Sequence, residues 1–224
     1  NLAVAADNKV PLVRDGAHTA VMAAARAHAS DVEVARAACS ALANLARQAD
    51  DNKVPMFRDG AHTVVMAAVR THAGDVEVAR EACGALLSLA YAVDNRVPLS
   101  DKGAHTVVMA AARAHAGDVE VARAACGALW NLSCSYERCI SLVRDGAHAT
   151  VIAAARAHPG DVEVARAACR TLCNLADEKR VLVRAGARTV ARAALEVHFY
   201  NLEVASVASH LQNRLGSSCE CSLQ

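Results

Sequence analysis

Aromatic residues are scarce in this sequence: they make up 3% of its 224 residues, whereas apolar types together make up 54%. Large rings therefore cannot fill the interior. The apolar residues are mostly Ala, Val and Leu, and such small side chains require the backbones to approach closely. Close approach of this kind is typical of packed helices, so the composition favours an all-α protein.

An excess of charge of either sign is also missing, because 24 Lys and Arg face 23 Asp and Glu, for a formal net charge of +1. A sequence-independent nucleic-acid binder needs a clustered basic excess to neutralise phosphates. The charge balance therefore argues against a nucleic-acid partner, although it leaves a local basic patch open.

Long apolar runs are absent from the sequence. None approaches the roughly 20 residues that cross a bilayer, so we expect no membrane span. No N-terminal signal peptide is recognisable either, but the chain opens on Asn1-Leu2-Ala3, which resembles Asn44-Leu45-Ala46 further along. We interpret this start as a cut inside a repeat, which makes the missing signal uninformative.

What the sequence does contain is repetition. The segment DVEVARAACGALWNLS, which begins at Asp118, returns with few changes at three other places, beginning at Asp31, Asp75 and Asp161. Self-similarity at a fixed period indicates a repeat array, in which stacked units share a continuous core. The length of the chain therefore reflects the number of repeats and not the number of separate domains.

Each repeat is predicted to form three helices. In the first repeat, residues 8–14 predict a short helix with Pro11 near its start, where a missing N–H costs little. Gly16 is expected to end this helix, since glycine readily takes a positive φ. Residues 17–28 predict an Ala-rich second helix, and Asp31 is well placed as the N-cap of a third helix.

Glycines at equivalent positions set the period of the array. They are Gly16, Gly60, Gly103, Gly146 and Gly186. Their spacings of 44, 43, 43 and 40 residues fit HEAT or armadillo repeats of about 40–47 residues better than tetratricopeptide or ankyrin repeats of about 33–34. We predict a repeat array over residues 1–216, divided into 1–6 (the end of a truncated repeat), 7–49, 50–93, 94–136, 137–176 and 177–216, and a flexible tail over 217–224.

The order of short helix, glycine, second helix and third helix resembles the armadillo repeat. The resemblance is carried by segments such as LVRDGAHTAVMAAARAH, from Leu12, and DVEVARAACGALWNL, from Asp118, and covers residues 7 to about 215. It implies a right-handed all-α solenoid, or superhelix, with three helices per repeat. One departure is that Ala24 and Ala25 stand where that family usually has leucines, which predicts tighter packing here.

A helical wheel separates the third helix of the first repeat into three faces. One face is an apolar stripe that packs on its own repeat. The second carries the small residues Ala35, Cys39 and Ala46, which allow a neighbouring repeat to approach. The third face is polar and carries Asn44, so we expect it to meet solvent or a ligand.

One position on the polar face recurs as a candidate binding site. It holds Asn44, Ser88, Asn131, Asn174 and Arg214. An amide offers both donors and an acceptor, so a row of asparagines could pair with the main chain of an extended peptide. In the armadillo proteins that this chain resembles, Asn at this position lines the concave face and clamps peptide main chain. The alternative is that each Asn is a solvated or self-capping residue near a helix end.

Four further residues complete the predicted groove: Ser40, Arg170, Glu33 and Glu120. Import receptors of the karyopherin-alpha type carry a Trp four residues before the groove Asn, where this chain has Ser40, Gly84, Gly127 and Arg170. The missing Trp ladder argues against classical basic-signal import. Glu33 and Glu120 each lie three residues before an arginine, so we expect them to form local ion pairs.

Four of the nine cysteines recur at one position of the third helix: Cys39, Cys83, Cys126 and Cys169. Equivalent positions in stacked helices lie beyond the Cα separation of roughly 4.4–6.8 Å that a disulfide allows. We interpret them as small buried thiols. This interpretation predicts a reducing compartment, cytoplasmic and/or nuclear.

Histidine recurs at two positions per repeat, one after the glycine and one at the end of the second helix. The first set is His18, His62, His105 and His148, and the second is His28, His72, His115 and His158. Neither set has the spacing of metal ligands, so we expect no metal and assign the second set to the helix C-terminal dipole. Cys219-Glu220-Cys221 and the pair Cys134 and Cys139 are weak redox or metal cues.

The sequence contains no unrepeated set of nucleophile, base and orienting residue, no phosphate loop and no Gly-x-Ser-x-Gly. We expect no enzymatic activity, no cofactor and no small-molecule substrate. The sequence predicts a non-catalytic protein–protein interaction scaffold that binds a protein or extended peptide along the concave third-helix groove. An alternative is a targeting arm of a larger regulatory protein, such as a ubiquitin ligase or a nuclear transport adaptor. Nucleic-acid binding by a helical solenoid is a third hypothesis, which the charge balance disfavours.

Overall fold

The computed structural model describes residues 6–216, which form fifteen α-helices, one 3-10 helix and no strand. The predicted all-α class is confirmed. Residues 1–5 and 217–224 lie outside the described residues, and with them lie most of the predicted truncated repeat, the predicted flexible tail and Cys219-Glu220-Cys221. The chain divides into two compact units, Asn1–Leu132 and Ser133–Gln224, which we call the N-terminal and C-terminal units.

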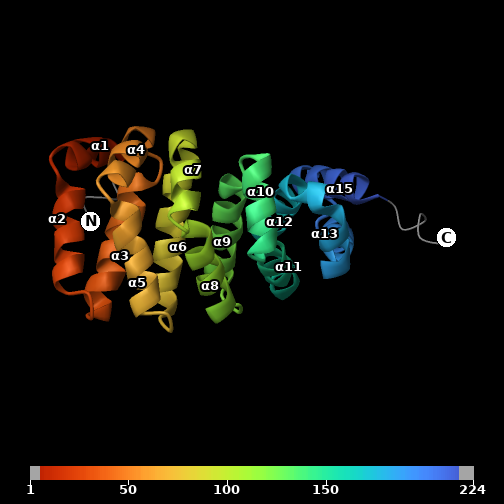
Figure 1. The fold of residues 1–224 in the computed structure, drawn as a ribbon, viewed down its shortest axis with the longest axis horizontal. Helices are drawn as coiled ribbons and strands as arrows, with labels where there is room; N and C mark the ends of the chain where they lie inside the picture. The colour runs from red at the N-terminus through yellow and green to blue at the C-terminus, as the bar shows by residue number, and fades with distance from the viewer. Residues whose placement is uncertain (1–5, 217–224) are drawn as a thin grey trace. The chain divides into compact units, whose positions relative to one another are not determined.

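The N-terminal unit consists of three successive helix triplets (Figure 1). They are α1 (Ala6–Arg14), α2 (Ala17–Ala27) and α3 (Val32–Ala46); α4 (Asp50–Arg58), α5 (Ala61–Thr71) and α6 (Val76–Tyr91); and α7 (Val93–Asp101), α8 (Ala104–Ala114) and α9 (Val119–Leu132). The third helices α3, α6 and α9 pack side by side, and each second helix packs on the third helix of its own triplet. The short first helices lie at one end of the longer ones (Figure 1).

The C-terminal unit continues the same order of elements. It contains α10 (Tyr136–Arg144), α11 (Ala147–Ala157) and α12 (Val162–Asn174), then the 3-10 helix η1 (Ala176–Glu178), α13 (Lys179–Ala185), α14 (Ala187–Val197) and α15 (Leu202–Leu215). Here α12 packs against α15, and α15 packs against α14. The sequence pattern did not indicate a division at Ser133, and the repeat boundaries given above stay predictions.

Two local signals in the sequence fix the ends of the helices. The carboxylate of Asp31 accepts hydrogen bonds from the backbone N–H groups of Glu33, at 2.9 Å, and Val34, at 3.2 Å, so it caps α3 as predicted. Gly16 takes a φ of 82° between α1 and α2, a left-handed conformation that favours glycine. The capping residue and the glycine therefore set the turns on either side of the second helix.

The first helices differ from the prediction in one respect. Helix α1 begins at Ala6, and α4 begins at Asp50, so Pro11 and Pro55 lie inside these helices and not in their first turn. A proline there cannot donate the usual helical hydrogen bond. In α4, the carbonyl of Asp51 therefore has no i→i+4 donor, which is tolerated in a helix this short and exposed at its N-terminal end.

The face of α3 that was predicted to carry small residues is buried, as expected. Ala35 is 6% exposed, and Cys39 and Ala46 are fully buried. The equivalent cysteines on α6, α9 and α12 are buried as well, and burial raises the pKa of each of the thiols of Cys39, Cys83, Cys126 and Cys169 to about 12. These side chains act as small apolar spacers between third helices.

Buried asparagines join successive triplets of the N-terminal unit. Asn52 is 1% exposed, and its Nδ2 donates to the carbonyl of Lys9 at 2.9 Å and to that of Leu45 at 2.8 Å. Asn95 makes the equivalent bonds to Lys53 at 2.9 Å and Leu89 at 3.0 Å. Each amide thus ties its own first helix to the preceding first and third helices, a role that the sequence alone did not reveal.

The second set of histidines makes a related contact. Nε2 of His72 and of His115 each lies 3.0 Å from a carbonyl in the turn of the preceding triplet, that of Ala29 and Ala73 respectively. In the C-terminal unit, Nε2 of His198 lies 2.9 Å from the carbonyl of Pro159. These partners belong to the neighbouring copy, and the expected interaction of the set with the dipole of its own helix stays a prediction.

Candidate binding surface on the third helices

The predicted groove position forms what we call the third-helix row: Asn44, Ser88, Asn131, Asn174 and Arg214. In the N-terminal unit, Asn44 on α3 is half-buried, and no hydrogen bond of its side chain is found among the described residues. Ser88 on α6 is buried, and its hydroxyl donates to the carbonyl of Gly84 in its own helix at 2.8 Å.

Asn131 is the member of the row with the most unusual surroundings. It lies near the end of α9 and is 4% exposed, yet its Nδ2 has no hydrogen-bond acceptor among residues 6–216. A buried donor without an acceptor costs about 1–3 kcal/mol. Nδ2 of Asn131 is therefore an unused donor, and the surrounding side chains cover it.

The two members in the C-terminal unit already have partners within the chain. Nδ2 of Asn174, at the end of α12, donates to the carbonyl of Ser133 at 3.1 Å and to its hydroxyl at 2.8 Å. The guanidinium of Arg214, on α15, donates to the carbonyl of Cys173 at 2.7 Å and to Asp177 at 2.6 Å. Both side chains therefore have acceptors within the C-terminal unit, whereas Nδ2 of Asn131 has none among the described residues.

The remaining predicted groove residues take part mainly in ion pairs. Glu33 pairs with Arg36 at 2.6 Å and Glu120 with Arg123 at 2.5 Å, as their three-residue spacing predicted, while Arg170 pairs with Glu203 at 2.6 Å. Ser40 is half-buried on α3. Pairs this exposed contribute about 0.2–1 kcal/mol each, so they hold the side chains in place more than they stabilise the fold.

Arginines of the third helices also reach the next copy within each unit. Arg36 and Arg80 bind Asp75 and Asp118, the residues that precede α6 and α9, while Arg166 pairs with Glu203 at 3.2 Å. The hydrogen bond from the neighbouring guanidinium is the main reason that the pKa of each of the carboxylates of Asp75 and Asp118 falls to about 2. The sequence indicated the pairs within a helix but not these longer ones.

The chain is similar to known proteins both in sequence and in fold. A family profile described as LRRK2 ARM repeat matches residues 4–99. Residues 4–99 are therefore similar to armadillo repeats. No curated protein sequence matches the chain.

The chain also matches solved structures. Two crystal structures of engineered proteins align with it, one with a TM-score of 0.79 at 24% identity over 96% of this chain and 85% of that chain. The other has a TM-score of 0.78 at 23% identity, over 96% of this chain and 87% of that chain. At these identities the likeness shows the fold alone, and that fold is an α-solenoid.

Residues 6–216 contain no group of three or more His, Cys, Asp or Glu side chains that could hold a metal ion. Within the same residues, no helix combines the length and the apolar character that crossing a bilayer requires.

The second helices carry a feature that the sequence reasoning missed. The alanines on them were expected to tighten the packing, but they line open hollows between successive second helices. The hollows lie between α2 and α5 (about 180 Å³), between α5 and α8 (about 270 Å³) and between α11 and α14 (about 280 Å³). Small residues draw the third helices together, whereas the shorter second helices are left spaced apart.

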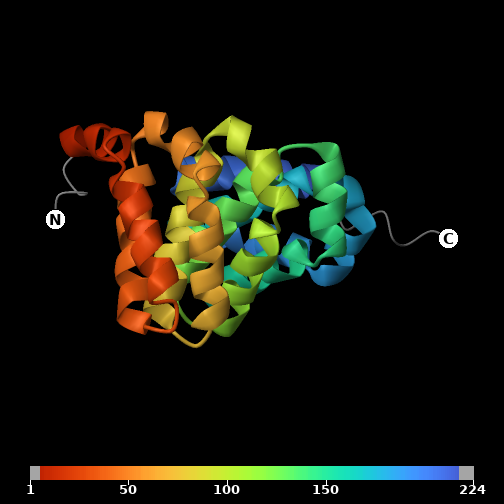
Figure 2. The ribbon, with the colours of Figure 1, turned by 60° about the vertical axis from the view of Figure 1, so that its left-hand side comes forward.

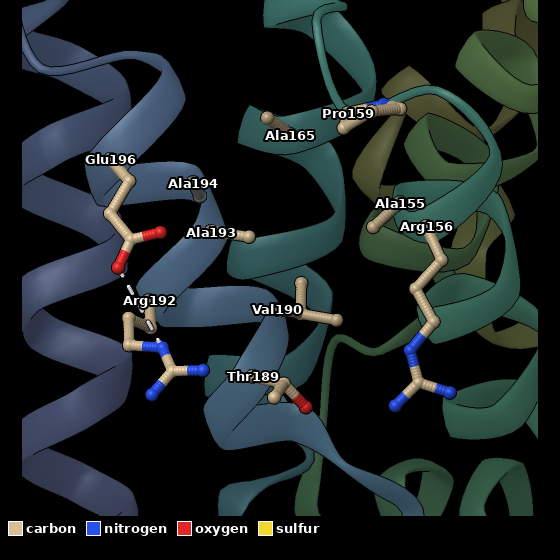
Figure 3. Close-up of a pocket in the computed structure, with 10 residues that line it drawn as sticks. All are labelled: Ala155, Arg156, Pro159, Ala165, Thr189, Val190, Arg192, Ala193, Ala194 and Glu196. Carbon is tan, nitrogen blue, oxygen red and sulfur yellow. Dashed lines mark ion pairs between the residues drawn. The ribbon is translucent and has the colours of Figure 1, made fainter.

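Figure 3 shows the hollow of the C-terminal unit. Val190 and Ala193 on α14 face Ala155 and Arg156 on α11 across it. A large apolar side chain at these alanine positions would fill the space. The presence of alanine there is the signal that could have revealed the hollow from the sequence.

Proposed function

We propose that this armadillo array is a non-catalytic protein-interaction scaffold whose third helices hold an extended segment of a protein partner. The observation that carries the proposal is Asn131, which is 4% exposed and has an Nδ2 without an acceptor among the described residues. Nδ2 itself is buried, so a main-chain carbonyl of a bound segment would satisfy this donor once the side chains that cover it move aside. Repeat proteins of this architecture commonly use extended surfaces for such binding.

The other members of the third-helix row support a limited contact. Asn44 lies two triplets before Asn131, and the hydroxyl of Ser88 between them keeps its acceptor capacity while donating to Gly84. We therefore place the binding segment along α3, α6 and α9. Asn174 and Arg214 are left out because both donate within the chain.

The neighbouring charges bear on the kind of segment that would bind. The glutamates and arginines on the third helices pair with one another or with capping aspartates. Paired charges attract neither a strongly basic nor a strongly acidic peptide. We therefore propose recognition through the peptide main chain, with no nucleic-acid partner and no small-molecule substrate.

We also propose a reducing location, in the cytoplasm and/or the nucleus. The support is that the seven cysteines among the described residues are free thiols. Four of them occupy helix-packing positions, where a small apolar side chain is needed.

A peptide selection tests the proposed function. A displayed library of random peptides is selected against the full chain, and the affinity of an enriched peptide is measured for the parent, Asn131→Ala and, as a matched control, Asn213→Ala, since Asn213 is exposed on α15. We expect Asn131→Ala to weaken binding by about tenfold without lowering the melting temperature, because the lost donor has no partner in the free chain.

A second measurement separates binding from folding. Asn174→Ala should lower the melting temperature, because Asn174 bonds to Ser133, and should leave affinity for the peptide unchanged. The proposal is wrong if no peptide is enriched, or if Asn131→Ala destabilises the fold and leaves peptide affinity at the parent value.

A further inference from the structure

Two apolar hollows follow one another along the second helices of the N-terminal unit. These helices are α2, α5 and α8, whose ribbons stand in succession in Figures 1 and 2. The hollows measure about 180 Å³ and 270 Å³, several times the roughly 30 Å³ that one water occupies in the liquid. Their lining residues stand at equivalent positions of successive copies. The same kind of hollow is therefore presented twice, one repeat apart.

The walls of these hollows are mostly apolar. Ala35 and Ala79, on the third helices, form the floor and are 6% and 3% exposed, and Val64 and Val107 line the sides. The mouth of each hollow carries an exposed alanine, Ala67 or Ala110. Apolar surface that is left in contact with water favours an apolar side chain in its place.

An arginine without a carboxylate partner stands at the edge of each hollow. Arg26 and Arg70 are exposed, and neither forms an ion pair or a hydrogen bond among the described residues. Helices α2, α5 and α8 contain no Asp or Glu. The carboxylates in the adjoining turns are engaged, since Asp31 caps α3 and Asp75 both caps α6 and binds Arg36.

We propose that this surface docks an acidic amphipathic helix of a protein partner, laid across α2, α5 and α8. Packed helices lie about 8–10 Å apart, and seven residues of an α-helix advance about 10.5 Å at 1.5 Å per residue. Leucines seven residues apart on the partner helix therefore reach successive hollows. Its carboxylates pair with Arg26 and Arg70, which supplies the charge complementarity.

The hollow of the C-terminal unit is less suited to this partner. Arg156 stands at its edge, but Nη2 of this residue lies 3.5 Å from the carbonyl of Ala185. A second arginine there, Arg192, pairs with Glu196 at 3.7 Å (Figure 3). The edge of this hollow therefore has less unpaired positive charge, and we place the docking site on the N-terminal unit.

Binding of a synthetic peptide to the full chain tests the proposal. The probe is a fluorescently labelled helix of about 18 residues, roughly 27 Å long, with two leucines seven residues apart and glutamates flanking each leucine. A matched peptide carries lysine in place of every glutamate. We expect fluorescence anisotropy to show saturable binding of the acidic peptide and at least tenfold weaker binding of the basic one.

Variants of the chain locate the binding. Arg26→Glu combined with Arg70→Glu should weaken binding of the acidic peptide at least tenfold, whereas Arg14→Glu, at an exposed arginine on α1, should not. Ala67→Leu combined with Ala110→Leu should block the hollows, whereas Ala20→Leu, at an exposed alanine of α2 that lines neither hollow, should have no effect. Leucine is nearly as good a helix former as alanine, so these variants keep the fold.

The outcomes distinguish this proposal from the one on the third helices. Asn131→Ala should leave binding of the acidic peptide unchanged, since Asn131 lies on α9. The proposal is overturned if the acidic peptide does not bind, if both peptides bind equally, or if the test variants weaken binding no more than their controls.

Discussion

The guanidinium of Arg36 on α3 binds the carboxylate of Asp75, the residue that caps α6 in the next copy. Nε donates to Oδ1 at 3.1 Å, and Nη2 donates to Oδ2 at 2.5 Å. The same carboxylate accepts from the backbone N–H of Val78 at 2.9 Å. One side chain thus caps a helix and holds the neighbouring helix, and Asp118 does the same with Arg80 and Val121.

These pairs predict an acid-sensitive contribution to stability. The pKa of Asp75 and of Asp118 is about 2 in the fold, against an ordinary value of 3.8. A lowered pKa means that the unfolded chain binds protons first, so the contribution is present above about pH 4 and is lost as the pH falls towards 2. We expect the urea midpoint to fall across this window.

The double variant Asp75→Asn, Asp118→Asn checks the cause. Asparagine retains a capping oxygen, as Asn201 shows by accepting from Val204 N–H at 3.1 Å, but it cannot pair as an anion. The variant should be less stable near neutral pH, by about 1 kcal/mol or less per pair, and should lose less stability between pH 4 and 2. An unchanged pH dependence would contradict this account.

Removing a buried asparagine should destabilise the N-terminal unit. Asn52→Ala or Asn95→Ala deletes two hydrogen bonds of a buried amide. We expect a loss of about 2 kcal/mol in the free energy of unfolding for each, measured by urea titration. Asn8 holds the equivalent sequence position in the first copy and is exposed, so Asn8→Ala serves as the control and should have little effect.

Glycine is required at the turn before a second helix but not at the turn after it. Gly103 has a φ of 78°, so Gly103→Ala should cost about 1 kcal/mol of stability. Gly117 has no positive φ and nothing within 4 Å of an added Cβ, so Gly117→Ala should be neutral or slightly stabilising. Thermal unfolding of the two variants compares the positions, and equal losses would argue against a backbone effect.

Thiol labelling should separate the cysteines by burial. In a chain with Cys219→Ser and Cys221→Ser, we expect Cys134, which is exposed, to react quickly with a thiol reagent. The four third-helix cysteines, whose pKa values of about 12 follow from burial, should react only when the chain unfolds. Mass spectrometry identifies the labelled sites, and fast labelling of Cys83 or Cys126 in the folded chain would contradict their burial.

The sequence predicted features that depend on one copy alone. Asp31 as a helix cap, Gly16 as a turn residue and Cys39 as a buried spacer all follow from the position of each residue in a helical pattern. Repetition strengthened each inference, because the same pattern recurs at equivalent positions. The same order of elements predicted the likeness of residues 4–99 to armadillo repeats.

Contacts between copies could not be predicted in this way. The bonds of Asn52 to Lys9 and of His72 to Ala29 join residues 43 positions apart, and no periodicity within a helix reports them. Asn131 and Asn174 share a sequence position, yet only Asn174 finds Ser133 as a partner. The candidate site on the third helices therefore stays a prediction, and the availability of each of its side chains depends on neighbours in space that the sequence does not report.

The bonds made by Asn52 and Asn95 also bear on how the length of such an array could change. Both amides bind carbonyls, which every amino acid provides, at the same two places in the preceding copy and in their own. An inserted copy would find acceptor carbonyls in the copy before it and would provide acceptor carbonyls to the copy after it. Units of this kind are therefore interchangeable, and the hydrogen bonds between neighbouring units are kept when the number of units changes.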